Sequence, residues 1–200
     1  MIKRLLLILL CVSVLFGITA CNAVDDAVNK AEDIVDSVMV AFKICDFKTT
    51  TEFIDMDKYE DTYSLFSDNQ MYLTKFFDDL EYDIVSSKQI DDNTVNVTAK
   101  ITAIDMLPVL RRLLSETVQF MSTATYADAF VAEKKSIERM EKILNSIAND
   151  DELETVTNEV VIKVVKNGSK WRIVPEEAFI NAVSGDFPKA LKEIESYDAE

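Results

Sequence analysis

The side chains best suited to chemistry in this chain are two carboxylates, a phenol and an indole. Tyr82 and Asp83 are neighbours, and Asp105 follows the next predicted strand. An Asp base beside a Tyr hydrogen-bond donor is the arrangement of some isomerases, so these residues are candidates for lining a ligand pocket. Trp171 could stack on such a ligand; its alternative is a place in the core beside Ile173.

Composition excludes most other catalytic arrangements. The chain has no histidine, which rules out His-dependent triads and zinc sites with His ligands. Its three glycines are too few for a dinucleotide-binding or phosphate-binding loop, and no Ser-x-x-Lys sequence occurs. We therefore expect a non-enzymatic protein without a cofactor, and we assign no catalytic residue.

Clustered acidic residues are the remaining candidate metal ligands. They occur at 55–57, 78–79, 91–92 and 150–152. A calcium loop needs glycine at its sixth position and glutamate at its twelfth, whereas the register from Asp55 places Glu60 and Phe66 there. Because Asp and Asn are common in turns and at helix N-termini, we expect these clusters to end elements rather than to bind metal.

The first 21 residues have the composition of an export signal. Two basic residues precede an uncharged run from Leu5 to Phe16, and small residues come before Cys21. The sequence Ile18-Thr19-Ala20-Cys21 resembles the lipobox of bacterial lipoproteins. That resemblance implies removal of residues 1–20, a diacylglycerol thioether on Cys21, and an anchor on the extracytoplasmic face of the cell membrane. The alternative, an uncleaved membrane helix, would need about 20 apolar residues, more than this run has.

Charge limits the partners of the processed chain. The formal net charge is −15, and loss of Lys3 and Arg4 with the signal makes it two units more negative. A surface of this sign repels phosphates and anionic headgroups, so we expect no nucleic-acid binding. The expected partners are the membrane, through the lipid on Cys21, and either an envelope protein or a small ligand.

An amphipathic helix is predicted over residues 24–45. Its apolar positions recur every three or four residues, at Val24, Val28, Ala31, Val35, Val38, Phe42 and Cys45. This stripe either packs on the domain's own sheet, as the flanking Ile34 and Met39 favour, or pairs with another chain. Cys45 is predicted to be a buried small hydrophobe; the alternatives for an unpaired thiol are a reactive group or an intermolecular bridge.

Two hairpins enclose a helical segment. The first comprises Glu81–Ile90 and Thr94–Ile104, which alternate in polarity, and the second comprises a strand over 160–164, the turn at Asn167-Gly168 and a strand over 169–174. Asp105 can cap the helical insert of residues 106–150, which divides into two helices near Thr123.

Short helices are predicted before and after the hairpins. Capping-box patterns at Thr49 and Ser67 each start a helix, and Pro175 and Asp186 start two more near the end of the chain.

This order predicts an α+β fold with one domain over residues 21–200. N-terminal helices pack on a curved antiparallel sheet of about four strands, with the insert between two hairpins. In the order of these elements, and above all in Asn167-Gly168, Lys170-Trp171-Arg172-Ile173 and Phe179, the chain is similar to small exported lipoproteins with a nuclear transport factor 2-like, or cystatin-like, fold. The 106–150 insert is not part of that pattern, and it either covers a cone-shaped pocket or leaves it open.

The function expected from these features is a lipid-anchored binding or interaction domain at the cell surface. One alternative is an assembly subunit that pairs through the 24–45 helix. The other is a pocket enzyme of the isomerase type, which would depend on Asp83 and Asp105.

Overall fold

The computed structural model describes residues 26–54, 70–123, 129–150 and 152–197. The lipobox with Cys21, the acidic residues at 55–57 and the capping box at Ser67 lie outside these ranges. A first helix over 26–43 precedes α2 (Phe47–Phe53), α4 (Gln70–Asp78), β1 (Glu81–Asp91) and β2 (Thr94–Ile104). The chain continues through α5 (Met106–Thr123), α6 (Ala129–Ala148), β3 (Thr155–Asn167), β4 (Lys170–Ile173), α7 (Glu177–Val183) and α8 (Phe187–Tyr197).

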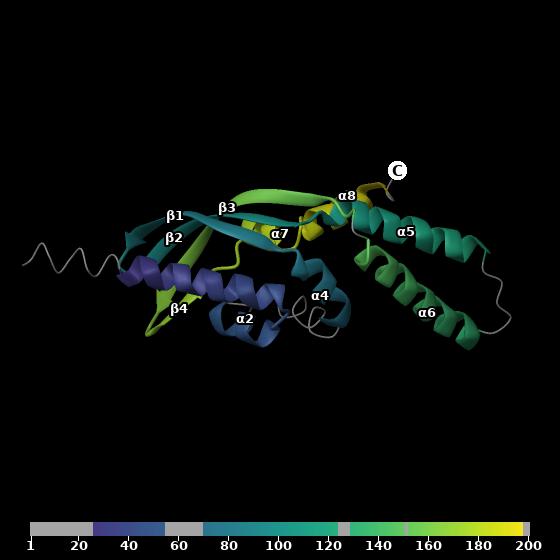
Figure 1. Ribbon diagram of the computed structural model, residues 1–200, viewed down its shortest axis with the longest axis horizontal. Coiled ribbons are helices and arrows are strands. Elements are labelled where there is room, and N and C mark those ends of the chain that lie inside the picture. The colour runs from purple at the N-terminus through teal and green to yellow at the C-terminus, as the bar shows by residue number, and fades with distance from the viewer. Residues whose placement is uncertain (1–25, 55–69, 124–128, 151, 198–200) are drawn as a thin grey trace, which may run out of the picture.

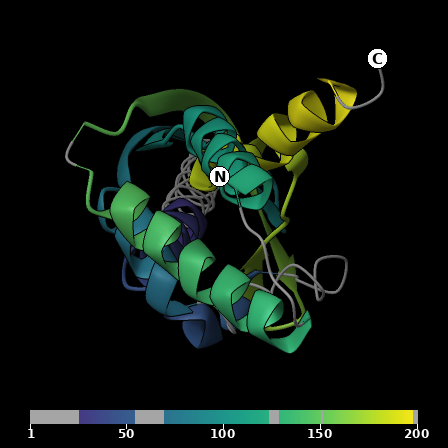
Figure 2. The same ribbon diagram turned by 90° about the vertical axis from the view of Figure 1, so that its right-hand side faces the viewer.

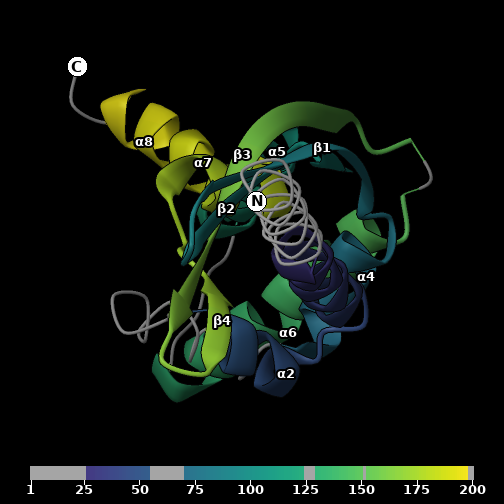
Figure 3. The same ribbon diagram turned by 90° about the vertical axis from the view of Figure 1, so that its left-hand side faces the viewer.

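The four strands form one antiparallel sheet in the order β1-β2-β3-β4, which confirms the predicted α+β fold. The sheet curves around the first helix, and α2 and β4 lie on the far side of that helix from β1 and β3 (Figure 3). Both predicted hairpins are present, and the insert lies between them, as expected.

Alternation along the strands places apolar side chains on the concave face. In β2, the residues predicted to share one face are all buried: Val95, Val97, Ala99, Ile101 and Ala103. In the first helix, Ala31, Val35, Val38 and the adjoining Cys45 are buried in the same core cluster, with Val28 and Phe42 packed against it. The stripe therefore packs on the chain's own sheet. Val24 lies outside the described residues.

Two element boundaries differ from the predictions. Helix α2 begins after Asp46, whose Oδ1 accepts the backbone N–H of Thr49 at 3.1 Å, so Thr49 lies within the helix and does not cap it. Strand β3 begins at Thr155, five positions before the predicted start, because residues 155–159 pair with the last part of β2. These residues are mostly polar, with Asn158 between Val156 and Val160, so their apolar alternation is too weak to indicate a strand.

The insert forms a helical arm, as predicted, with α5 and α6 as its two helices. Asp105 accepts the backbone N–H of Leu107 at 3.0 Å and so caps α5. A second core cluster of Ile104, Val109, Ile143 and Ile147 joins the arm to the end of the sheet. The arm projects from the end of the molecule that is opposite the described start of the first helix (Figure 1). In Figure 2 the arm faces the viewer. Among the described helices, none is both long and apolar enough to cross a bilayer.

Candidate functional site: an acidic hollow at one end of the sheet

The sheet topology gathers acidic residues that are far apart in the sequence. Strands β1 and β3 both run antiparallel to β2, so they begin at the same end of the sheet. Asp78 and Asp79 immediately precede β1, and Asp150 precedes β3. The acidic residues that end α4 and α6 therefore meet beside Glu81, the first residue of β1.

A hollow of about 560 Å³ lies between these segments. Its carboxylates come from Asp78, Asp79, Glu81 and Asp150, and Lys75 supplies a cation. Thr102, Thr155 and Asn149 add polar groups, while Ile104 and Leu153 line its apolar part. Thr102 and Thr155 come from neighbouring strands, so the floor is the end of the sheet and the walls are helix ends.

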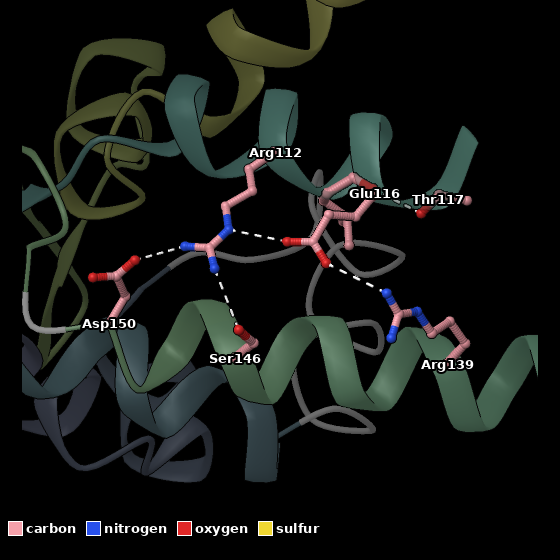
Figure 4. A network of polar contacts seen from close by, with 7 residues as sticks. Arg112, Glu116, Thr117, Arg139, Ser146 and Asp150 are labelled. Atoms are coloured by element: carbon pink, nitrogen blue, oxygen red, sulfur yellow. Dashed lines mark hydrogen bonds and ion pairs between the residues drawn. The ribbon is translucent and has the colours of Figure 1, made fainter. Parts of the chain in front are cut away.

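One wall is held by an ion-pair network between α5 and α6 (Figure 4). The Arg112 guanidinium donates to Asp150 at 2.6 Å, to Glu116 at 3.1 Å and to Ser146 at 3.3 Å. Arg139 lies 4.0 Å from the second oxygen of Glu116. Arg112 therefore joins both helices of the arm to the segment that leads into β3.

Through this network, the negative charge of one carboxylate in the hollow, that of Asp150, is balanced by Arg112. The backbone N–H of Glu152 and then the Arg112 guanidinium hold the pKa of Asp150 below its ordinary value. Asp150 therefore stays ionised but is neutralised locally by Arg112. Within the described residues, no ion pair is present at Asp78, Asp79 or Glu81.

This arrangement can attract a cationic group, such as an amine or a basic side chain, by charge alone. It does not have the geometry of a metal site: within the described part of the chain, no three His, Cys, Asp or Glu side chains converge closely enough to hold an ion. The acidic clusters at 78–79 and 150–152 do lie at element ends, as the sequence predicts for turn and capping residues.

Tyr82 has a defined partner from the first helix. It is partly buried, and its hydroxyl donates a hydrogen bond to a carboxylate oxygen of Asp36. Burial first, and then this carboxylate, raise the pKa of Tyr82 to about 12. Asp83, the next residue along β1, faces the opposite side of the sheet and is exposed. A joint acid/base site of these two side chains is therefore not formed.

The other two candidates lie apart from Tyr82. Tyr82 is paired with Ile101, so Asp105 is four residues further along β2, about 13 Å away at the rise of a strand. Trp171 lies on β4, at the opposite edge of the sheet, packed partly against the core, with Lys166 Nζ 5.9 Å from its ring centre. The three residues therefore have separate structural roles. Tyr82 contacts the first helix, Asp105 caps α5, and Trp171 packs at the edge of the core.

Cys45 is buried, as predicted, and follows the first helix with a positive φ of 53°. Burial raises the pKa of its thiol, which opposes formation of the reactive thiolate. The buried alternative therefore fits this residue better than a reactive group.

The concave face of the sheet is filled by side chains. Phe179 of α7 is buried and lies edge-on to Phe42, and Phe42 stacks on Phe77 with ring centres 5.8 Å apart. These aromatic side chains belong to the first core cluster or pack against it, and the cluster fills this face in the described part of the chain. The arm projects to one side and does not cover this face (Figure 1).

The sequence analysis predicted no site from the acidic pairs, because it did not predict that residues 78–79 and 150 lie around one hollow. The sequence places each acidic cluster shortly before a strand, but the order of the strands, which brings the two clusters to one end of the sheet, was not predicted. Comparisons with protein-family models, with curated proteins and with solved structures find no match to this chain.

Proposed function

We propose that this chain is a lipid-anchored extracytoplasmic domain that binds a protein partner at the cell surface and is not an enzyme. The observation that carries the proposal is the lipobox-like Ile18-Thr19-Ala20-Cys21, which follows an apolar run too short to span a bilayer. The described part of the first helix starts at residue 26, only five positions after Cys21, so the acylated residue would stand close to a folded domain.

Two structural observations favour binding through the surface over binding in an interior pocket. The concave face of the sheet is filled by buried residues such as Ile101, Ile162 and Phe179. The isomerase alternative loses support as well, because Tyr82 and Asp83 face opposite sides of β1. The assembly alternative through the 24–45 stripe is disfavoured because that stripe lies in the chain's own core.

The anchor is tested by the mass and acyl content of the protein expressed in a bacterial host. The wild-type chain should lose residues 1–20 and carry a thioether-linked diacylglycerol, whereas Cys21→Ser should do neither. Cys11→Ser, a matched change inside the apolar run, should leave processing and acylation intact. A wild-type chain that keeps residues 1–20 and carries no acyl group would overturn the anchor.

A small cationic ligand is the second candidate, favoured by the acidic hollow. A native mass spectrum of residues 22–200, purified without lipid, separates the two candidates, since both core clusters of the described residues are kept in this chain. A bare monomer is the result expected for a protein-binding domain. A constant extra mass that disappears in Asp79→Asn with Glu81→Gln would instead assign the hollow to a ligand.

A further inference from the structure

The end of the sheet opposite the acidic hollow lies at the start of the first helix. Phe42, late in this helix, stacks on Phe77 just before β1, and Asp36, one and a half turns earlier, bonds Tyr82 near the beginning of β1. The helix therefore runs antiparallel to β1, and its start points toward the turn that joins β1 to β2. Figure 1 shows the same placement.

The β3–β4 turn lies at this end too. The backbone N–H of Lys166, near the end of β3, donates to the carbonyl of Asn93 in the β1–β2 turn at 2.8 Å. We call the two turns and the strand ends that meet there the turn end of the sheet; it comprises residues 88–96 and 163–172.

The distance between the turn end and the proposed anchor is short. Five residue steps separate Cys21 from residue 26, and extended chain covers at most about 18 Å over that length. Whatever path those residues take, acylation of Cys21 holds the start of the first helix close to the headgroups.

The turn end carries basic residues in a chain that is strongly acidic elsewhere. Lys88 and Lys163 flank Asn96 in one row of the sheet, and Lys166, Lys170 and Arg172 lie around the β3–β4 turn. In the described residues none of these five cations forms an ion pair. The carboxylates at this end are Asp91 and Asp92 in the β1–β2 turn, Glu176 near Lys163, and Asp26 in the described start of the first helix.

A partly exposed aromatic residue accompanies these cations. Trp171 is only partly buried and faces the same side of the sheet as its partner Lys166, whereas Lys170 and Arg172 face the other side. Ile90 at the end of β1 is 51% exposed. Tryptophan prefers the boundary between headgroups and hydrocarbon, and lysine side chains extend from that boundary toward the phosphates. A partly exposed indole and, among the described residues, five cations without ion pairs at one end of the sheet are thus a combination suited to a lipid surface.

We propose that the turn end of the sheet docks on anionic phospholipid headgroups and so orients the anchored domain on its membrane. This inference rests on the proposed lipid anchor at Cys21. Basic side chains near an anionic surface are attracted over about one Debye length, roughly 8–10 Å. The acidic hollow lies at the other end of an eleven-residue strand, about 35 Å away, so docking of the turn end places the hollow several Debye lengths from the headgroups.

Trp171 is the only tryptophan in the chain, so its fluorescence reports on the turn end directly. The processed, acylated protein is inserted into vesicles of phosphatidylcholine alone and into vesicles that also contain phosphatidylglycerol. We expect a blue-shifted emission and protection from aqueous acrylamide only with phosphatidylglycerol, and we expect both effects to be lost when salt is added.

The paired variant Lys163→Glu with Lys170→Glu should lose the shift and the protection while keeping Lys166 over the Trp171 ring. Lys142→Glu with Lys192→Glu, the same charge change on α6 and α8, should keep both. Circular dichroism confirms that the variants are folded, and Lys170→Gln alone, an exposed change, should weaken the shift if the double variant unfolds.

Flotation of the protein with neutral vesicles separates failure of this proposal from failure of the anchor. Protein that floats but gives identical emission on both lipids retains its anchor and overturns the docking. Equal loss of the shift in the control pair also overturns it, because bulk charge would then explain the effect. Protein that does not float with neutral vesicles refutes the anchor, and a shift produced only by an added acidic protein would assign the turn end to a protein partner.

Discussion

At the scale of single residues, Tyr82 and Cys45 owe their chemistry to the first helix and its neighbours. Both are polarisable groups that sequence alone offers as reactive, and both are withdrawn from reaction by burial. Tyr82 keeps its proton first because its partly buried position solvates a phenolate poorly, and then because ionisation would place that phenolate beside Asp36. Cys45 keeps its proton because the surrounding core solvates a thiolate poorly.

The ionisation of Tyr82 is a direct test of that contact. With its pKa raised to about 12 from an ordinary value near 10, the protonated phenol favours the folded state. Its contribution to stability should be complete below about pH 10 and should disappear as the pH rises toward 12. The chain has six tyrosines, so the ultraviolet titration of phenolate is compared with that of Tyr82→Phe.

Asp36→Asn removes the carboxylate while leaving a hydrogen-bond acceptor. The late phenolate step should then move toward lower pH but stay above the ordinary value, because burial is the larger cause of the shift. A late step that survives in Tyr82→Phe would mean that another tyrosine is responsible.

At the scale of elements, two glycines with a left-handed backbone differ in how much space surrounds them. Gly185 ends α7 and Gly168 lies in the β3–β4 turn, and both have positive φ, 59° and 64°. A Cβ at Gly185 would stand 1.7 Å from the carbonyl oxygen of Ile104, whereas a Cβ at Gly168 would meet nothing within 4 Å. Gly185 also accepts the backbone N–H of Met106, so it connects α7 to the start of the arm.

This difference predicts unequal costs for the same substitution. Gly168→Ala should lower the free energy of unfolding by about 1–2 kcal/mol, the cost of a left-handed backbone. Gly185→Ala should lower it by about 3 kcal/mol or more, because the Ile104 carbonyl must also move. Urea denaturation of both variants measures the difference, and equal losses would show that the close approach to Ile104 is relaxed in solution.

Two valines on opposite sides of the first helix distinguish its core-facing side from its exposed side. Val35 is completely buried, whereas Val40, on the other side of the helix, is 45% exposed. Val35→Glu should therefore cost about 4 kcal/mol or more by placing a carboxylate in the core, and Val40→Glu should change stability by less than about 0.5 kcal/mol.

Circular dichroism melting and sedimentation are the measurements for this pair. A folded Val35→Glu variant that has lost a concentration-dependent dimer would contradict the core assignment and would restore the assembly alternative. Loss of a partner with Val40→Glu, with the fold unchanged, would identify the exposed side of this helix as a binding surface.

At the scale of the whole molecule, charge is distributed unevenly along the sheet. Asp78, Asp79 and Glu81, which form no ion pair among the described residues, gather where β1 begins, and lysines gather at the turn end. The ion pair of Lys100 with Glu159 lies between the two ends and is more than half exposed, so it adds little to stability. With 36 acidic and 21 basic residues, repulsion among carboxylates is expected to oppose folding at neutral pH.

Net charge predicts how stability responds to salt. At a formal net charge of −15, the compact state repels itself, and added salt screens that repulsion. The melting temperature should rise as sodium chloride increases from a low-salt buffer to physiological ionic strength. The dependence should flatten near pH 4.4, the isoelectric point, and a melting temperature that falls with salt at neutral pH would mean that surface ion pairs outweigh the repulsion.

The sequence by itself determined the elements and the fold class, because these follow from local patterns. Period-two alternation in 94–104 and the three-to-four spacing of residues 28–45 each specify which face is buried, and the structure confirms both faces. The Asn167-Gly168 turn and the Asp105 cap were read correctly for the same reason: a left-handed turn and an orphan N–H each favour few residue types. The start of β3 was misplaced because its first residues are stabilised by pairing with β2, which local alternation does not encode.

Only the tertiary structure decided which chemical groups lie together. Asp79 and Asp150 are brought to one hollow by strand direction, and Arg112 neutralises just one of them through a contact 38 positions away in the chain. Tyr82 and Trp171 are separated because β1 and β4 are opposite edges of the sheet. Proximity between distant residues is set by the register and order of strands, and those depend on the packing of the whole core rather than on any local pattern.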